Sequence, residues 1–217
     1  MTLTQTIKVN SAFFVPYSLF LLAGSAVLAL FGKTDIHLFI NIHHAILFDY
    51  FFRYWTLIGL GWLIFPVVFW LSFIRLRYVI IAVAAFIISA AINDTIKQIV
   101  NAPRPAEYFG ELHRSLYLIP GVTVYHWDSF PSGHSTTAFC LFCMAALVAR
   151  SNLWKATWFV VALLVAYSRM YLSEHFLIDV YTGSIVGVLS TVICYNMAMK
   201  MHWLDKFPAM DKPLFRL

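Results

Sequence analysis

Six long apolar stretches constrain the fold of this sequence more than any other feature. Each has a length close to the ~20 residues that an α-helix needs to cross the hydrocarbon core of a bilayer. The stretches cover residues 13–31, 56–74, 78–97, 133–149, 153–172 and 179–199. The chain of 217 residues is 61% hydrophobic and 12% charged, whereas a soluble domain has about 25% charged residues. We therefore predict one all-α domain over residues 1–217, an integral membrane bundle of six transmembrane helices.

The first apolar stretch could also be a cleaved signal peptide. It is long for the h-region of such a peptide, so we expect a retained helix. Tryptophans lie near several predicted helix ends, where an aromatic belt would place them. They are Trp55, Trp70, Trp154 and Trp203. Cys140 and Cys143 lie inside an apolar stretch without a second cysteine pair, which favours buried packing over redox or metal chemistry.

The distribution of basic residues predicts the orientation of the chain. With six helices, both termini lie on one side, together with nine Lys and Arg residues: Lys8, Arg75, Arg77, Arg150, Lys155, Lys200, Lys206, Lys212 and Arg216. The other side carries six: Lys33, Arg53, Lys97, Arg104, Arg114 and Arg169. Because basic loops favour the cytoplasm, we expect cytoplasmic termini. The same bias explains the net charge of +5 without a nucleic-acid partner.

Three polar clusters lie at predicted helix ends. Ionisable residues at the ends of membrane helices are energetically costly and usually functional. The first cluster, residues 97–105, closes the third predicted helix; the second, residues 131–134, opens the fourth; the third, residues 168–179, lies between the fifth and the sixth. By parity, all three fall on the same side of the membrane, which predicts that they form one site.

The residue types in these clusters suit the binding of phosphate. Lys97, Arg104 and Arg169 supply positive charge, and an arginine can bind two phosphate oxygens at once. Ser132 and Gly133 lie at a predicted helix start, where backbone N–H groups and the helix dipole favour anions. A glycine there lets the backbone approach the phosphate closely.

Two histidines are candidates for the chemical step. His175 and Asp179 are four residues apart, and if this stretch is helical they share a face. Asp179 could then accept a hydrogen bond from one ring nitrogen of His175, while the other attacks phosphorus. His134 could protonate the leaving oxygen. Glu174 would point elsewhere on such a helix. This set of roles requires no metal ion and no cofactor.

Each cluster taken alone has a simpler interpretation. A lone basic residue can orient a helix or snorkel, a PSGH sequence can be a turn with a helix cap, and a His–Asp pair can be structural. Their occurrence in order on one side of the membrane favours a phosphate site. His37, His43 and His44 lack a distinctive ligand spacing, so we expect no metal there.

A long loop, residues 104–130, lies on the same side as the three clusters. Long ordered loops are often functional. From Tyr108 to Tyr117 its apolar residues have roughly helical spacing, so this segment is expected at the membrane interface. His113, Arg114 and His126 are further candidates for contact with a substrate headgroup.

The three clusters together resemble the signature of a known family. The segments KQIVNAPRP (residues 97–105), PSGH (131–134) and SRMYLSEHFLID (168–179) are similar to the three motifs of the type 2 phosphatidic acid phosphatases, the PAP2 superfamily. This superfamily includes membrane lipid phosphatases and soluble vanadium haloperoxidases. No motif position departs from the pattern, and the resemblance covers roughly residues 60–195.

The resemblance implies a six-helix bundle and a metal-independent mechanism through a phosphohistidine. His175 would attack phosphorus, Asp179 would orient His175, and His134 would protonate the leaving group. The implied ligands of the transferring phosphoryl group are Lys97, Arg104, Ser132, Gly133 and Arg169. The implied substrate is a lipid phosphate or diphosphate, with undecaprenyl diphosphate, lipid A phosphate, phosphatidylglycerol phosphate and phosphatidate as candidates.

Two other functions stay open. The same phosphohistidine could pass its phosphoryl group to another lipid, or the chain could bind or transport phosphorylated lipid without catalysis. We expect a multi-pass protein of a bacterial inner membrane, with the site facing the periplasm or the outside. The expected partners are the phosphorylated lipid and membrane lipids, with no nucleic acid and no obligate protein partner.

Overall fold

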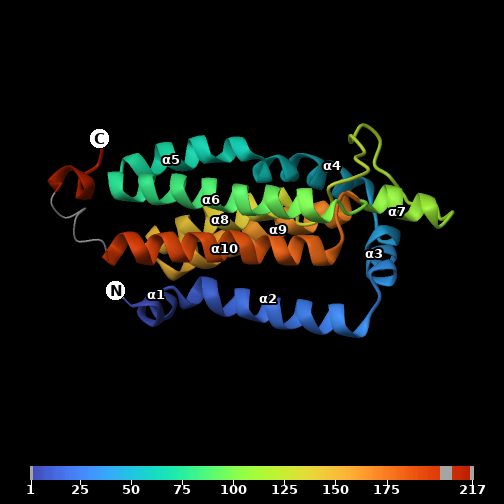
Figure 1. Ribbon diagram of the computed structural model, residues 1–217, viewed down its shortest axis with the longest axis horizontal. Helices are drawn as coiled ribbons and strands as arrows, with labels where there is room; N and C mark the ends of the chain where they lie inside the picture. Colours follow the sequence, from blue (N-terminus) through green and yellow to red (C-terminus); the bar gives the residue numbers. More distant parts are fainter. Residues whose placement is uncertain (1, 201–206, 216–217) are drawn as a thin grey trace.

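The computed structural model describes residues 2–200 and 207–215. Trp203, Lys206 and Arg216, which enter the predictions of the aromatic belt and the orientation, lie outside these ranges. Within them every regular element is helical (Figure 1), which confirms the all-α prediction. The longer helices are α2 (Ser11–Leu30), α6 (Leu76–Val100), α8 (Gly133–Val148), α9 (Asn152–Tyr171) and α10 (Leu177–Lys200). The shorter elements are α1 (Leu3–Val9), α3 (Lys33–Ile42), α4 (Ile46–Trp55), η1 (Thr56–Gly59), η2 (Gly61–Leu63), α5 (Ile64–Ser72), α7 (Pro105–Glu111) and η4 (Pro208–Asp211).

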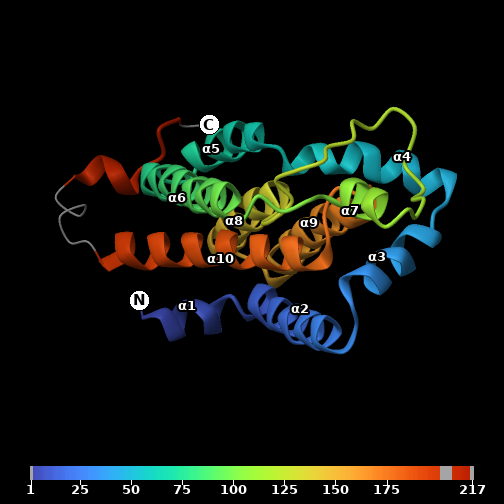
Figure 2. The ribbon, with the colours of Figure 1, turned by 45° about the vertical axis from the view of Figure 1, so that its right-hand side comes forward.

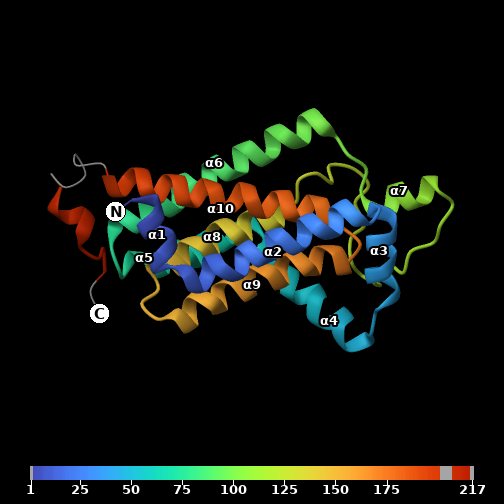
Figure 3. The same ribbon diagram turned by 90° about the horizontal axis from the view of Figure 1, so that it is seen from below.

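Helix α8 forms the centre of the bundle. It packs against α6, α9 and α10, and α2 runs along α9 and α10 on the outside (Figure 3). Most of α8 is buried, including Cys140 and Cys143, which confirms their prediction as packing residues. Two glycines of α10 allow the close approach, because a Cβ at Gly183 would lie 2.6 Å from the Ser132 carbonyl and one at Gly187 2.4 Å from the Thr136 carbonyl. Small residues permit such close helix packing within membranes.

The predicted membrane spans are only partly confirmed. Among the described residues, three segments are long and apolar enough to cross a bilayer: Ser11–Leu30, Leu76–Glu111 and Leu177–Lys200. A bent pair, Ile46–Gly59 with Gly61–Ser72, would make a fourth, and α8 is a shorter apolar helix of 16 residues. Several apolar helices are therefore present, but six spans are not established by their length and composition.

The prediction of one continuous helix over residues 56–74 is wrong. This region contains η1, η2 and α5, and the two halves of the bent pair differ in direction by 60°. The break lies between Gly59 and Gly61, where glycine lowers helix stability. Gly59 also packs too closely for a side chain, since a Cβ there would lie 2.6 Å from Val165 and 3.0 Å from His134.

The three polar clusters lie at the same end of the bundle. Figure 1 shows α3 and α7 at that end, and α1 and η4 at the opposite one. Figure 2 shows that α3 leads from the end of α2 toward α4. The fold therefore gathers the polar clusters under a cap made of α3, α4, α7 and the long loop.

Candidate active site

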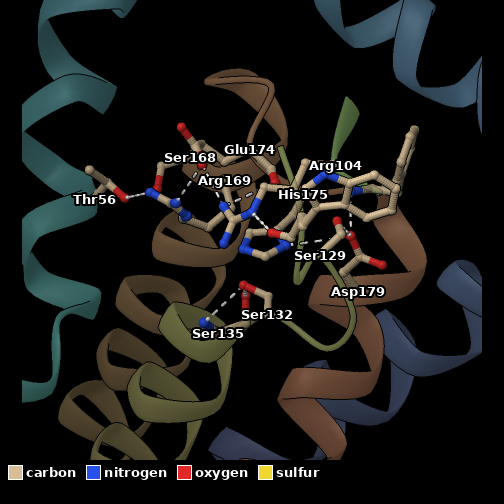
Figure 4. Close-up of polar contacts among 12 residues, drawn as sticks. Thr56, Arg104, Ser129, Ser132, Ser135, Ser168, Arg169, Glu174, His175 and Asp179 are labelled. Atoms are coloured by element: carbon tan, nitrogen blue, oxygen red, sulfur yellow. Dashed lines mark hydrogen bonds and ion pairs between the residues drawn. The ribbon is translucent and has the colours of Figure 1, made fainter. Parts of the chain in front are cut away.

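The three polar clusters meet as parity predicted. Lys97 lies in the last turn of α6, and Gly133 and His134 open α8. A Cβ at Gly133 would lie 4.0 Å from the Lys97 Nζ atom, so the end of α6 is adjacent to the start of α8. The third cluster contributes Arg169, in the last turn of α9, and the turn that leads into α10 (Figure 4).

His175 lies in the turn between α9 and α10 and not on a helix. Helix α9 ends at Tyr171 and α10 begins at Leu177. The backbone N–H groups of Glu174 and His175 both donate to the Arg169 carbonyl, at 3.0 and 3.2 Å. A helix that carries both His175 and Asp179 is therefore wrong, and their close approach comes from the tight turn before α10.

The Asp179 carboxylate is fixed beside the imidazole of His175. Its Oδ2 atom accepts hydrogen bonds from Ser129 Oγ at 2.5 Å and from the backbone N–H of Phe176 at 2.8 Å. The His175 Nδ1 atom lies 3.4 Å from the same oxygen, within ion-pair distance. Within the described part of the chain, Nδ1 has no hydrogen bond. Contacts of this kind are often loose in unliganded sites and tighten when substrate binds.

His175 is in an environment that favours the neutral imidazole. Its side chain is almost fully buried. Burial lowers the pKa of His175 well below 6.5, and the positive charges of Arg169, Arg104 and Lys97 lower this pKa further. A neutral imidazole has the lone pair that a nucleophile needs. The four side chains therefore form a site in which a histidine stays uncharged among cations.

Arg104 and Arg169 converge on one carboxylate, which the sequence interpretation placed elsewhere. Glu174 Oε2 accepts a hydrogen bond from Arg104 Nη1 at 2.5 Å and lies 3.4 Å from Arg169 Nη2. Figure 4 shows Glu174 beside both guanidinium groups. The expectation that Glu174 points away from the site is wrong, because it rested on a helix through His175, which lies in a turn.

Further contacts orient the two arginines. Arg104 Nε donates to the Trp127 carbonyl at 2.8 Å, and Arg169 Nη1 donates to Thr56 Oγ1 at 2.7 Å. Thr56 lies in η1, so the broken segment of the predicted second helix supplies a hydrogen-bond acceptor for Arg169. The Nε atom of Arg169 is buried and finds no hydrogen-bond partner in the described residues. This donor is available to an anion.

The start of α8 provides backbone donors. Ser132 is the N-cap, and its Oγ accepts from the backbone N–H of Ser135 at 3.4 Å and from Ser135 Oγ at 3.1 Å. These bonds leave the hydroxyl proton of Ser132 for another acceptor. The backbone N–H groups of Gly133 and His134 are also at the free end of the helix, where an anion is favoured.

His134 lines two cavities. One, of about 290 Å³, also contacts Thr56, Arg169 and Glu174. The other, of about 250 Å³, lies toward α6 and also contacts Gly61 and Phe86. His134 therefore lies between a cavity that Arg53 and Arg169 line and a cavity beside the helix break.

Helix α3 supports the turn that carries His175. His37 Nε2 lies 3.2 Å from Ser173 Oγ, and Asn41 Nδ2 donates to the same oxygen at 3.0 Å. Burial lowers the pKa of His37 to about 4, which keeps it neutral. His43 contacts the carbonyl of Phe39, and His44 contacts that of Asn41. Across residues 2–200 and 207–215, no group of three or more His, Cys, Asp or Glu side chains is placed to hold a metal ion.

The long loop is tied to α3 and α4 by its aromatic residues. Tyr108 Oη lies 3.2 Å from Thr34 Oγ1, and Tyr117 Oη donates to Asp49 at 2.8 Å. Helix α7 ends at Glu111, so the helical spacing continues into irregular chain after that residue. Of the three headgroup candidates, His126 pairs with Glu107 at 2.7 Å, and all three are exposed. Tyr108 and Tyr117 therefore join the long loop to α3 and α4, and Leu112, Tyr117 and Trp127 are exposed.

Comparison with known proteins identifies the wider relationship. Residues 78–203 match the family model of the PAP2 superfamily. The chain is 30% identical over 79 residues to the bacitracin transport permease protein BcrC of Bacillus licheniformis, and 31% identical over 77 residues to a lipid A 4'-phosphatase of Porphyromonas gingivalis. These alignments cover 36% and 35% of this chain and only 38% and 33% of the two relatives.

Two crystal structures share the fold. Aquifex aeolicus LpxE superposes with a TM-score of 0.68 and 28% identity, over 78% of this chain and 98% of LpxE. A PAP2-type phosphatidylglycerolphosphate phosphatase from Bacillus subtilis gives a TM-score of 0.57 at 21% identity, over 86% of this chain and 96% of that one. The family match covers more than half of the sequence and all three polar clusters. The chain belongs to the PAP2 superfamily.

Proposed function

We propose that this protein is a membrane lipid phosphatase that cleaves a lipid phosphate or diphosphate through a phosphohistidine at His175, without a metal ion. The observation that carries the proposal is the position of His175. It is a buried imidazole that burial and nearby cations keep neutral, with Nδ1 facing the Asp179 carboxylate at 3.4 Å. A neutral nucleophile with an orienting carboxylate is the arrangement that covalent catalysis needs.

In the first step, His175 Nε2 attacks phosphorus and the bond from phosphorus to the lipid oxygen breaks. Asp179 accepts a hydrogen bond from Nδ1–H and stabilises the positive charge that develops on the ring. His134, protonated while the phosphate dianion lies beside it, donates a proton to the departing lipid oxygen. Lys97, Arg104 and Arg169, with the Ser132 hydroxyl and the backbone N–H of Gly133, bind the oxygens of the transferring group and stabilise its charge.

In the second step, water attacks the phosphohistidine. His134, now deprotonated, accepts a proton from that water, and the bond from phosphorus to Nε2 breaks. Inorganic phosphate forms, and His175 and His134 return to their starting states. The sum is one lipid phosphate and one water converted to one lipid alcohol and one phosphate.

The two cavities at His134 suggest how a lipid is placed. The phosphoryl group would lie beside His134 and Gly133, at the edge of the cavity that contacts Arg169 and Glu174. The lipid oxygen would then leave toward the cavity at Gly61 and Phe86, because His134 must reach that oxygen. We propose lateral access from the membrane at this point. Six crossings would be made by α2, the bent α4–α5 pair, α6, α8, α9 and α10.

The names of similar proteins support a lipid phosphate as the substrate class. Lipid A phosphate and phosphatidylglycerol phosphate are candidates because two of the similar proteins are named phosphatases of such lipids. Undecaprenyl diphosphate and phosphatidate stay candidates from the sequence. We propose a bacterial inner membrane location, with the site on the periplasmic or outer side and the termini in the cytoplasm.

A panel of these lipids tests the function directly. Purified protein in detergent should release inorganic phosphate from at least one of them, and His175→Ala should abolish release. The matched control is His43→Ala, since His43 is exposed and contacts Phe39 in the last turn of its own helix. Full activity of His175→Ala would contradict the proposal.

The same assay separates the alternatives. One relative bears the name of a transport permease, so binding without catalysis is a defined alternative for this chain. It predicts that the lipid binds to the protein and no phosphate is released by the wild type. A phosphotransferase would instead produce a second phosphorylated lipid without stoichiometric phosphate.

A further inference from the structure

Glu174 is a buried carboxylate among the groups assigned to phosphate. It is 4% exposed and immediately precedes His175. Its Oε2 atom accepts from Arg104 Nη1 at 2.5 Å and lies 3.4 Å from Arg169 Nη2. The mechanism above assigns no step to it. A buried acid that contacts both guanidinium groups of an anion site nevertheless affects every anion that binds there.

The contacts of Glu174 are those that a phosphate oxygen would make. Carboxylate and phosphate oxygens both bind the N–H groups of arginine through charge-assisted hydrogen bonds. Burial raises the pKa of Glu174, whereas Arg169 and Arg104 lower it. An unpaired carboxylate would be costly in this environment, so its burial depends on the two arginines. The same carboxylate in turn orients both arginines.

Glu174 also changes the charge of the site. Lys97, Arg104 and Arg169 carry three positive charges, and Glu174 offsets one of them. The three cations and Glu174 together carry +2, less than the charge of the cations alone. The Asp179 carboxylate, which accepts from Ser129 and Phe176, adds a further negative charge beside His175. Strong binding of the substrate and the product does not by itself accelerate the chemical step. A lower net charge weakens the binding of inorganic phosphate and therefore favours its release.

We propose that Glu174 is a positioning residue that acts as an internal competitor of phosphate. Its carboxylate orients Arg104 and Arg169 in the empty site and limits the affinity of the site for phosphate and for more highly charged anions. This inference rests on the proposed function, because it assumes that Arg104 and Arg169 bind the transferring phosphoryl group.

The test is the affinity of the full-length protein for two probes, inorganic phosphate and methylenediphosphonate, measured by calorimetry in detergent. Glu174→Gln keeps the shape of the side chain and removes its charge. The dissociation constant for phosphate should fall by about tenfold or more, because one negative charge close to the anion is lost in a partly desolvated site. The fall should be larger for methylenediphosphonate, which carries more charge.

A second variant keeps the test decisive if Glu174→Gln does not fold. Glu174→Asp retains the charge but retracts it from the arginines by one methylene, so phosphate should bind more tightly than to wild type and more weakly than to Glu174→Gln. The matched control is Glu111→Gln at the exposed end of α7, which should bind both probes like wild type.

The outcomes separate this inference from the proposed function. If the wild type neither binds phosphate nor hydrolyses any lipid phosphate, the proposed function fails. If the wild type does both, and neither Glu174 variant binds phosphate more tightly than wild type, the competitor role is overturned and Glu174 serves only to hold the arginines.

Discussion

A methyl group added at Gly133 would test where the anion binds. A Cβ at this position would lie 3.7 Å from Asn93 Nδ2 and 4.0 Å from Lys97 Nζ, both ordinary contact distances. The fold therefore accepts alanine, but the added methyl group lies between the helix start and the lysine, where the phosphoryl group is proposed to bind.

Gly133→Ala should accordingly lower kcat/KM by about tenfold or more, which corresponds to ~1.4 kcal/mol of lost transition-state stabilisation. The midpoint of thermal unfolding should not decrease. Gly110→Ala is the matched control, because a Cβ at Gly110 meets nothing within 4 Å. Wild-type kinetics in Gly133→Ala would place the phosphate elsewhere.

The lowered pKa of His175 predicts a pH profile. The nucleophile must be deprotonated, and its pKa lies well below 6.5 because of burial and the surrounding cations. Activity should therefore persist as pH falls below 6.5 and be lost only at lower pH. The profile of kcat/KM reports on the free enzyme, after correction for ionisation of the substrate phosphate.

The Arg104→Gln variant tests whether nearby cations lower the pKa of His175. This change removes one of the cations that lower the pKa of His175, so the acid limb of the residual activity should move to higher pH. A wild-type acid limb at or above pH 6.5 would contradict the assigned environment of His175.

The sequence predicted residues whose side chains meet in the structure, but not all of their neighbours. Lys97, His134 and His175 could be found because parity and spacing put them at one end of the helices. Glu174 was missed because a helical wheel cannot describe a turn between two helices. Thr56 was missed because its contact with Arg169 depends on η1, which replaces the expected regular helix.

At the scale of elements, hydropathy predicted the positions of five of the six helices to within a few residues. The exception is residues 56–74, whose apolar composition is compatible both with one straight helix and with the broken helix that the structure has. Apolar content measures how favourably a segment lies in lipid, and it contains no information on direction. The bend depends on tertiary packing at Gly59, against Val165 and His134.

The helix break is the proposed place where the lipid chain lies. A Cβ at Gly61 would lie 3.7 Å from Phe86 Cζ, an ordinary contact distance, and Gly61 lines the adjoining cavity. Gly61→Phe should raise KM for a long-chain lipid phosphate about tenfold, because a few methylenes worth ~0.8 kcal/mol each lose their binding surface.

A short-chain phosphate ester separates this effect from damage to the chemistry. Its hydrolysis by Gly61→Phe should match the wild type, and Gly61→Ala should behave like the wild type with both substrates. Equal loss of activity toward the long and the short ester would argue against lipid access at the break.

For the molecule as a whole, the sequence predicts that the site lies on the side of the membrane opposite the cytoplasmic termini. The basic residues favour cytoplasmic termini, and Figure 1 places α7 at the end of the bundle opposite α1. Ser115 in the long loop and Asn152 at the start of α9 are both exposed. They mark the two ends of the bundle.

Labelling of single cysteines in intact cells tests this orientation. With the native cysteines replaced, Ser115→Cys should react with a membrane-impermeant maleimide added outside, and Asn152→Cys should react only after the cells are opened. The reverse pattern would put the site on the cytoplasmic side.

The most direct test of the whole account is to trap the covalent intermediate. Rapid acid-free quenching of the enzyme with a lipid substrate labelled in its terminal phosphate should yield labelled protein. The label should be acid-labile and should map to the peptide containing His175, and His175→Ala should carry none. Phosphate release by the wild type without any labelled protein, or a label on another residue, would contradict the proposed mechanism.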